Sequence, residues 1–521
     1  MIQHPFARRS LLGCGLFLGL SAGRAAALSQ HLLRADPFTL GVAAGDPAPD
    51  GFVIWTRLAP NPLEQGGDMP PVDVAVGWEV ATDPQFRTIV RKGEQRAIAA
   101  LAHSVHVEVD GLLPHRHYWY RFFAPGNIAS PVGKARTLPA TDATVAKARI
   151  ASVGCQDYER GLYTAYRHLA AESDVDAVFH YGDYIYEFGP REEGIVRRHW
   201  GGETMTLSDY RLRYAQYKLD PDLQAAHASA AFIMSFDDHE VDDNWGGPYG
   251  KDGGPLDLFA ARKAAAFQAW YEHMPVGARF RPDLPGSQCY RRFDFGTLMR
   301  MHVLDTRSFR SRQLCEGDGM TKAQRAACVP VDAPERTMLG AEQEGWLNEG
   351  LRHAAGWHFV AQQVMMMAYD ARKDDETKPR ISTDNWNGYP QARQRFVDMI
   401  RRLERTNVVI GSGDMHQNVV GHVTADAANP LSAPVAAEFL ATSITSSGTG
   451  GLRYPGELNV LDNNPNVKLL NNQRGYHVYT VQPQQWMADV KVVDQIDRPG
   501  GTSTSLATFS VDPRRPTPEF I

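Results

Sequence analysis

The sequence predicts an α/β protein built as a layered sandwich, with sheets flanked by helices, that follows an all-β domain of the immunoglobulin or fibronectin III type. Short β-rich runs separated by Gly, Pro and Asp fill residues 38–138, and after residue 148 apolar strand-like runs alternate with helical patterns. Three of the apolar runs lead into a carboxylate with a histidine close by, within residues 177–183, 231–240 and 408–416. Ligands of open α/β sheets gather at the carboxyl ends of strands, so this pattern indicates a metal centre.

The first 27 residues have the composition of an export signal. Arg8 and Arg9 precede an apolar stretch at residues 11–22, and alanines at 25–27 offer a cleavage site. Paired arginines in this position resemble a twin-arginine signal, and a plain positively charged leader is the alternative. We expect export through the twin-arginine machinery to the periplasm or the medium. No later run reaches the ~18 apolar residues that a membrane span needs.

Residues 38–140 form the predicted all-β domain. Alternation of period two recurs at residues 51–57, 72–80, 103–109 and 117–122, with turn residues between the runs. This spacing favours a β-sandwich of roughly 100 residues. Leu112 to Pro114 followed by Tyr118 resembles the tyrosine corner of such domains, so we expect these aromatic residues to pack in the core.

Residues 149–490 are assigned to the α/β domain and residues 491–521 to a C-terminal tail. A strand, a helix and a second strand open the domain as a compact βαβ unit, and a later hairpin is expected to turn at Gly296 and Thr297. The strands and helices that we expect cover residues 149–154, 162–171, 177–180, 257–273, 292–304, 341–353, 357–367, 391–404 and 407–410.

Charge and cysteine content narrow the class of protein. The formal net charge is −6, so the sequence lacks the excess of basic residues that is typical of nucleic-acid-binding proteins. Cys315 and Cys328 flank a polar loop, and we expect a disulfide between them, as in an oxidising compartment. Cys289 is expected to be a buried thiol. Cys155 follows an apolar run at a strand end and therefore joins the candidate metal ligands.

A pair of catalytic metal ions needs a bridging carboxylate, neutral imidazoles and hard oxygen ligands. Asp183 is the best bridging candidate, because it directly follows a predicted buried strand. Tyr186 lies three residues further on, and a phenolate there would be a strong ligand for ferric iron. The alternative for Tyr186 is a core aromatic residue. His180 is expected to pack, because its side chain points to the other face of the strand.

Six motifs occur in a fixed order, among them Gly-Asp-Tyr-Ile-Tyr-Glu at 182–187 and Asp-Asp-His-Glu-Val-Asp-Asp-Asn-Trp at 237–245; the others stand at 152–156, 305–307, 386–389 and 413–416. As an ordered set they resemble the alkaline phosphatase D (PhoD-like) family of phosphatases and phosphodiesterases, over residues 38–490. The resemblance implies a calcineurin-like metallophosphoesterase core behind an immunoglobulin-like domain. It also implies Fe³⁺ with one or two Ca²⁺ ions.

The resemblance implies a ligand set as well. Cys155, Asp183 and Tyr186 would surround the iron, with Asp183 reaching a second cation. The remaining implied metal ligands are Asp238, Asn244, Asp414 and His416.

Several of these residues have other readings. Cys155 could be a plain buried thiol and Asn244 a turn residue. Asp414 could instead orient the imidazole of His416, and either histidine, His239 or His416, could be a helix cap or make a buried hydrogen bond.

The predicted reaction is hydrolysis of phosphate mono- or diesters by a metal-activated hydroxide, with Asp183, His239 and Arg307 as the catalytic residues. Arg307 would hold the substrate phosphate, and a salt bridge with Asp305 is its alternative. Two other functions stay open. One is a phospholipase D-like phosphodiesterase on the same scaffold, and the other is an exported binding module with a structural metal site.

One motif departs from the family. Asn387 stands where the family usually has Asp, and the nearby Asp384 could replace that carboxylate.

Overall fold

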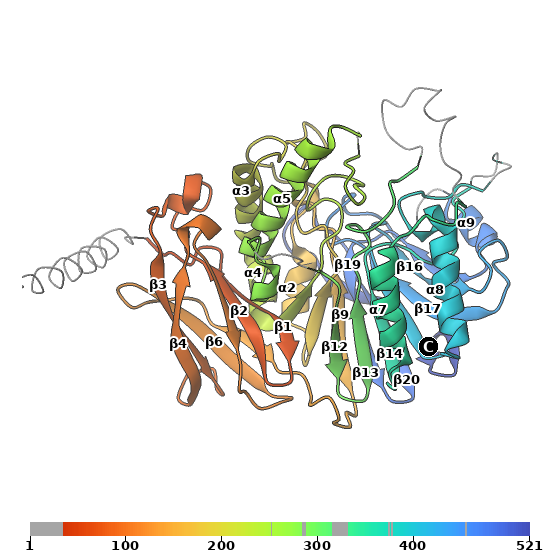
Figure 1. Cartoon of the computed structure of the whole chain (residues 1–521), viewed down its shortest axis with the longest axis horizontal. Coiled ribbons are helices and arrows are strands. Elements are labelled where there is room, and N and C mark those ends of the chain that lie inside the picture. Colours follow the sequence, from red (N-terminus) through yellow and green to blue (C-terminus); the bar gives the residue numbers. More distant parts are fainter. Residues whose placement is uncertain are drawn as a thin grey trace, which may run out of the picture.

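The computed structural model describes residues 35–251, 253–283, 288–314, 332–372, 376, 379–453 and 456–521. The predicted leader at 1–27 and the predicted Cys315–Cys328 disulfide lie outside these residues. Two mixed sheets form the centre of the molecule, and helices cover their outer faces (Figure 1). Within the described residues no helix combines the length and the apolar character needed to cross a membrane.

The larger sheet has ten strands, and its central strands are the ones that the sequence predicts. β9, β10 and β11 pair in parallel, and β1 continues the parallel set beside β11. Each of these strands is almost wholly buried, which explains why it has a continuous apolar run rather than an alternating one. The strands follow the order β22 (Arg515–Phe520), β21 (Ser503–Asp512), β20 (Gln485–Val493), β19 (Gly475–Gln482), β9 (Ala148–Val153), β10 (Ala177–His180), β11 (Ala231–Met234), β1 (Val42–Ala48), β2 (Gly51–Arg57) and β5 (Ser104–Val109).

Residues at both ends of the chain extend this sheet. Residues 491–521, which the sequence analysis treats as a tail, contribute the end of β20 and the strands β21 and β22. At the other edge β1, β2 and β5 belong to the same sheet, although they lie within the all-β segment. The N-terminal segment is therefore joined to the α/β core by continuous backbone pairing.

The all-β prediction for the N-terminal segment is confirmed. A second sheet packs on β1, β2 and β5 through a shared apolar cluster. Its strands follow the order β4 (Ile89–Ala97), β3 (Val74–Ala81), β6 (His117–Ala124) and β7 (Ile128–Ala129), and β8 (Gly133–Arg136) also pairs with β6. Tyr118 Oη accepts a hydrogen bond from the Leu113 backbone N–H at 2.9 Å. This is the local contact expected of a tyrosine corner.

The other central sheet has seven strands. Its first two form the hairpin that the sequence predicts, and Gly296 has a positive φ of 57° at the turn. The strands follow the order β12 (Arg291–Phe295), β13 (Met299–Val303), β14 (Trp357–Ala361), β15 (Val408–Ser412), β17 (Pro434–Leu440), β16 (Asn418–Thr424) and β18 (Val467–Asn471).

The predicted strand at 357–367 is too long. Strand β14 ends at Ala361, and beyond it the backbone N–H groups of Met366 and Met367 donate to the two carboxylate oxygens of Glu438 at 2.8 and 2.6 Å. A buried apolar run can thus satisfy its backbone through a buried side chain and not through a neighbouring strand.

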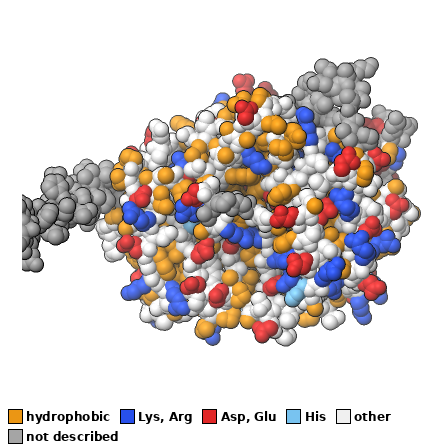
Figure 2. All heavy atoms as spheres, in the orientation of Figure 1, with side chains coloured by type: hydrophobic (Ala, Val, Ile, Leu, Met, Phe, Trp, Pro, Cys, Tyr) orange, Lys and Arg blue, Asp and Glu red, His pale blue; other side chains and the backbone are white. Residues whose placement is uncertain are grey.

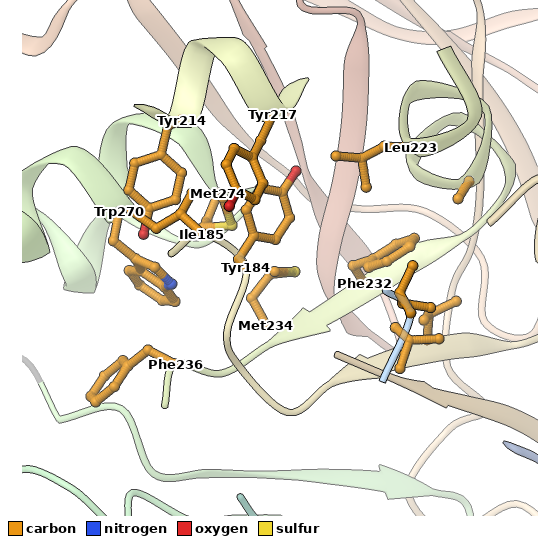
Figure 3. Close-up of a cluster of buried hydrophobic side chains, with 14 of the residues drawn as sticks. Tyr184, Ile185, Tyr214, Tyr217, Leu223, Phe232, Met234, Phe236, Trp270 and Met274 are labelled. Atoms are coloured by element: carbon orange, nitrogen blue, oxygen red, sulfur yellow. The ribbon is translucent and has the colours of Figure 1, made fainter. Parts of the chain in front are cut away.

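The core of the α/β part lies in three layers. One apolar cluster fills the space between the two sheets and includes Phe179, Phe359 and Trp486. A second lies under the helices of the larger sheet, where Tyr214 and Tyr217 of α3 and Trp270 of α5 meet Tyr184 beyond β10 (Figure 3). A third lies under the helices of the smaller sheet. The helices are α2 (Thr164–Ala170), α3 (Leu207–Lys218), α4 (Pro221–Ser229) and α5 (Leu256–His273) in the first group, and α7 (Gly340–Arg352), α8 (Pro390–Arg402) and α9 (Glu457–Asn463) in the second.

Candidate metal centre

The loops that follow four strands converge at one edge of the two sheets. Cys155 follows β9, Asp183 follows β10, Asp238 follows β11, and Asp414 follows β15. Because β9, β10 and β11 are parallel neighbours, their carboxyl ends lie side by side. The packing of the two sheets brings the β15 loop to the same place.

Glycine-led turns place three of these residues. Cys155, Asp183 and Asp414 each follow a glycine and have positive φ angles of 51°, 54° and 68°. Asn244 and His416 also have positive φ angles, of 56° and 58°. Residues with a side chain rarely adopt this conformation, and its clustering is typical of functional sites.

The ring of Tyr181 lies between two of those glycines. A Cβ atom added to Gly154 would lie 2.1 Å from the Tyr181 ring, and one added to Gly413 would lie 2.2 Å from it. Tyr181 Oη donates to the carbonyl oxygen of Thr442 at 2.5 Å, which fixes the ring in place. The absence of side chains at both glycines therefore lets the loops after β9 and β15 approach each other.

The first candidate ligand group contains Cys155, Asp183 and His416, whose donor atoms lie within 4.8 Å of one another. Tyr186 joins it, because its Oη donates to Asp183 Oδ2 at 2.8 Å and lies 3.1 Å from His416 Nε2. The pKa of the Cys155 thiol is raised well above its usual value, first by burial and then by the charge of Asp183. A cation at this group would reverse that effect.

Two further ligand groups overlap with the first among the described residues. Asp183, Asp238 and His239 form one, and Asp237, Asp238 and Asp414 form the other, each with donor atoms within 4.8 Å. Asp183 is shared by the first two groups, and Asp238 is shared by the last two. Shared carboxylates of this kind are what closely spaced cations require.

Three oxygens of the acidic side chains have no hydrogen-bond donor among the described residues. Asp183 Oδ1, Asp237 Oδ2 and Asp238 Oδ1 are buried without a hydrogen-bond partner. Burial raises the pKa of Asp183 and of Asp414 well above the usual range, and it raises that of Asp237 to about 7. Buried carboxylate oxygens without a hydrogen-bond donor are costly, and hard cations satisfy them. The donor set, with one thiol, one phenol, imidazoles and carboxylates, therefore fits metal ions.

His239 is held by a carboxylate that the sequence analysis did not single out. Its Nδ1 lies 2.7 Å from Glu187 Oε2, and its ring stacks on Tyr186 with the ring centres 4.0 Å apart. Burial disfavours the charged imidazole, but Glu187 and Asp238 outweigh burial and raise the pKa of His239 well above its usual value. Glu187 Oε1 also accepts the backbone N–H of Asp243 at 2.7 Å.

Arg307 is fully buried among the carboxylates. Its guanidinium pairs with both oxygens of Asp384, at 2.7 and 3.1 Å, with Asp414 at 3.3 Å, and with Asp237. The alternative of a salt bridge with Asp305 is wrong, because Asp305 Oδ1 accepts the backbone N–H of Arg307 at 3.1 Å and lies away from the guanidinium contacts. The sequence could not distinguish these carboxylates, since Asp384 is 77 residues away.

Asn244 and Asn387 lie in different places and make different contacts. The Asn244 backbone N–H donates to Asp238 Oδ2 at 2.7 Å, which puts Asn244 beside the centre. The Asn387 side chain donates to Asn385 Oδ1 at 2.9 Å and to the Met367 carbonyl at 3.2 Å. Asp384, not Asn387, is the residue of this segment that meets Arg307.

Besides Glu187, three residues at the site were not singled out from the sequence: Glu240, Ser446 and Ser447. Glu240 is buried and accepts the backbone N–H groups of Asp183, Tyr184 and Asp237 at 3.1, 2.7 and 2.8 Å, so it ties the loops after β10 and β11 together. Its place within the acidic run 237–243 was a usable signal. Ser446 and Ser447, in a loop rich in Ser and Thr, carried none.

Two layered sheets with helices outside and shared carboxylates at the strand ends define a metallophosphoesterase-like hydrolase. Comparison with known proteins makes this specific: the family model described as PhoD-like phosphatase matches residues 150–490, and the one described as PhoD-like phosphatase, N-terminal domain, matches residues 23–139. The chain belongs to the PhoD-like phosphatase family, and it is an enzyme that hydrolyses phosphoric ester bonds.

Individual relatives agree with the family assignment. The chain is 43% identical to alkaline phosphatase D of Bacillus subtilis (strain 168), over 97% of this chain and 88% of that protein. A solved structure described as that of PhoD superposes with a TM-score of 0.88 at 42% identity, covering 94% of this chain and 93% of the other. The likeness includes the N-terminal domain as well as the core.

Proposed function

We propose that this protein is an exported phosphoesterase that hydrolyses phosphate mono- and diesters at the strand-end centre, with Fe³⁺ and one or two Ca²⁺ ions as cofactors. The observation that carries the proposal is the chain of three ligand groups joined by Asp183 and Asp238, with three buried carboxylate oxygens left without donors. Arg307 offsets part of the negative charge, but one guanidinium cannot satisfy this many buried carboxylate oxygens, and the remaining ones favour bound cations.

The donor chemistry separates the ligands. Cys155 and Tyr186, with Asp183 and His416, provide the thiolate, phenolate and imidazole that suit ferric iron. Asp238 and Asp414, with Asp237 and Asn244, provide the oxygen donors that suit calcium. When bound, the cations would lower the pKa of a water molecule and neutralise the charge of the substrate phosphate.

The protein side chains then bind, orient and transfer protons. Glu187 holds His239 through Nδ1, and we assign the Nε2 of His239 to giving a proton to the leaving-group oxygen and not to binding a metal. Arg307 has no exposed surface and is surrounded by Asp237, Asp384 and Asp414. We therefore infer that it neutralises and positions these carboxylates, and that it does not hold the substrate phosphate directly.

The rival functions have less support. A phospholipase D-like enzyme would need an apolar access groove. Met365, Met366 and Met367 do not provide one, because all three are buried in the core. A binding module with a structural metal site would not need the His239–Glu187 pair beside the ligands.

The proposed export by a twin-arginine leader, to the periplasm or the medium, rests on the sequence alone.

Hydrolysis of p-nitrophenyl phosphate and bis-p-nitrophenyl phosphate tests the proposal, with metal content measured on the same samples. We expect both esters to be cleaved by protein that contains iron and calcium, and Asp183→Asn to lose both metal and activity. Asp294→Asn is the matched control, because Asp294 pairs with Arg300 at the β12–β13 hairpin, away from the centre. A wild-type protein that hydrolyses both esters at full rate after complete removal of metal would refute the proposal.

A further inference from the structure

One loop beside the centre has no part in the function described so far. Ser446, in the segment after β17, is 1% exposed, and its Oγ lies 2.6 Å from Tyr186 Oη and 2.8 Å from the carbonyl oxygen of Cys155. The same Oγ accepts the backbone N–H of Asp157 at 3.2 Å. A single hydroxyl thus contacts two of the residues that would bind iron.

A buried arginine fixes this loop. Arg474 is 1% exposed and donates to Ser443 Oγ and to the Ser446 carbonyl oxygen, while its other terminal nitrogen donates to the Asn472 carbonyl. Within the part of the chain that the structure describes, its guanidinium is held by these neutral oxygens. The groups near it that can become anionic are Tyr181, Cys155 and Tyr186. An arginine buried among neutral oxygens is unusual, and anionic ligands next to it would compensate its charge.

The hydrogen bonds of Tyr186 indicate what the hydroxyl does. In the described structure Tyr186 Oη donates its own proton to Asp183 Oδ2 at 2.8 Å. If a cation takes the place of that proton, Oη can only accept, and the single hydroxyl proton of Ser446, which can otherwise go to the Cys155 carbonyl oxygen, would be donated to it. Hydrogen bonds to charged acceptors are about twice as strong as those to neutral ones. Partners of this kind tune the metal through its ligand.

We propose that Ser446 is a positioning residue that donates a hydrogen bond to the metal-bound oxygen of Tyr186, with Arg474 holding its loop, and that it thereby sets the strength of the bond between Tyr186 and iron. This inference rests on the proposed function, in which Tyr186 is an iron ligand. It adds a residue that no ligand set includes.

The adjacent serine provides a matched control. Ser447 Oγ lies 2.9 Å from His416 Nδ1, so it contacts an imidazole of the same centre and not the phenol. Removal of either hydroxyl disturbs the same loop, but only the loss of Ser446 removes a hydrogen bond from Tyr186.

The visible spectrum of the iron-loaded protein tests the inference. A phenolate bound to Fe³⁺ gives a charge-transfer band, which Tyr186→Phe should abolish. Loss of the hydrogen bond leaves the phenolate more electron-rich, so Ser446→Ala should move the band to longer wavelength. Ser446→Thr should keep the wild-type position, and Ser447→Ala, which removes a partner of the imidazole and not of the phenolate, should move the band less than Ser446→Ala does. If Ser446→Ala does not fold, Ser446→Gly, which also removes the hydroxyl without adding a metal-binding group, should shift the band in the same direction.

The outcomes are separable. A wild-type band that Tyr186→Phe abolishes but that the Ser446 variants leave unmoved would overturn this inference alone. An equal shift in Ser447→Ala would also overturn it, because the effect would then belong to the loop as a whole. Iron-loaded wild-type protein without a band that depends on Tyr186 would overturn the iron assignment in the proposed function, and this inference with it.

Discussion

Replacing Gly413 with alanine should damage the centre through Tyr181, without touching a candidate ligand. The new Cβ would lie 2.2, 2.3 and 2.7 Å from three atoms of the Tyr181 ring. Ordinary contacts of this kind are about 3.5–4.0 Å, so the ring would have to move by more than 1 Å. It cannot do so easily, because Gly154 is against the ring as well and Tyr181 Oη is bonded to Thr442. We expect a loss of about 3 kcal/mol, at the upper end of the range for overpacked cores.

Thermal melting of Gly413→Ala, Tyr181→Ala and the double variant measures this effect. Because the clash requires the ring, Gly413→Ala should cost much less stability when Tyr181 has already been replaced, and the difference is the coupling between the two residues. The single variant should also bind iron less tightly, because Asp414 directly follows Gly413. An equal loss of stability in the presence and absence of the Tyr181 ring would refute the reasoning.

Three further predictions follow from the structure. Gly345→Ala should raise stability by about 0.5–1 kcal/mol in thermal melting, because Gly345 is exposed within α7 and a Cβ there meets nothing within 4 Å; a lower melting temperature would contradict this. Glu187→Gln should lower kcat roughly 10- to 100-fold while the bound iron and calcium stay unchanged, because Glu187 orients His239 from outside the ligand groups; an unchanged kcat would exclude that role. Chelation should lower the melting temperature, and added calcium should restore part of it, because Asp237 and Asp238 each have a buried oxygen without a donor; equal melting before and after chelation would count against a cation there.

The sequence predicted correctly which residues lie together where a candidate ligand closely follows the end of a buried strand. Asp183 and Asp414 directly follow a Gly after a buried strand, and a fold that places parallel strands side by side brings such residues together. The hairpin at Gly296 was predictable for a similar reason, because its turn is local. These features depend on short stretches of chain.

Other features depend on contacts between distant segments. The partners of Arg307 come from three separate loops, so its adjacent Asp305 was a misleading guide. The early end of β14 depends on Glu438, more than 70 residues away. Helices α3 and α4 were not predicted. The buried face of α3 consists mainly of tyrosines and polar residues, so it lacks the apolar stripe that reveals a helix.

Ser446 and Glu187 show the same limit at the site itself. Each acts on a candidate site residue through one hydrogen bond. The sequence around Ser446 is not distinctive, and Glu187, although it ends the motif at 182–187, could not be paired with His239 from the sequence. Residues that orient ligands are defined by position in the fold, so the structure is needed to find them.

X-ray diffraction from crystals of the purified protein, measured on either side of the iron absorption edge, tests the central claim most directly. The account predicts one anomalous peak between Cys155, Asp183 and Tyr186, with calcium density at the carboxylates of Asp238 and Asp414. Iron elsewhere in the molecule, or no metal among these side chains in active protein, would contradict it.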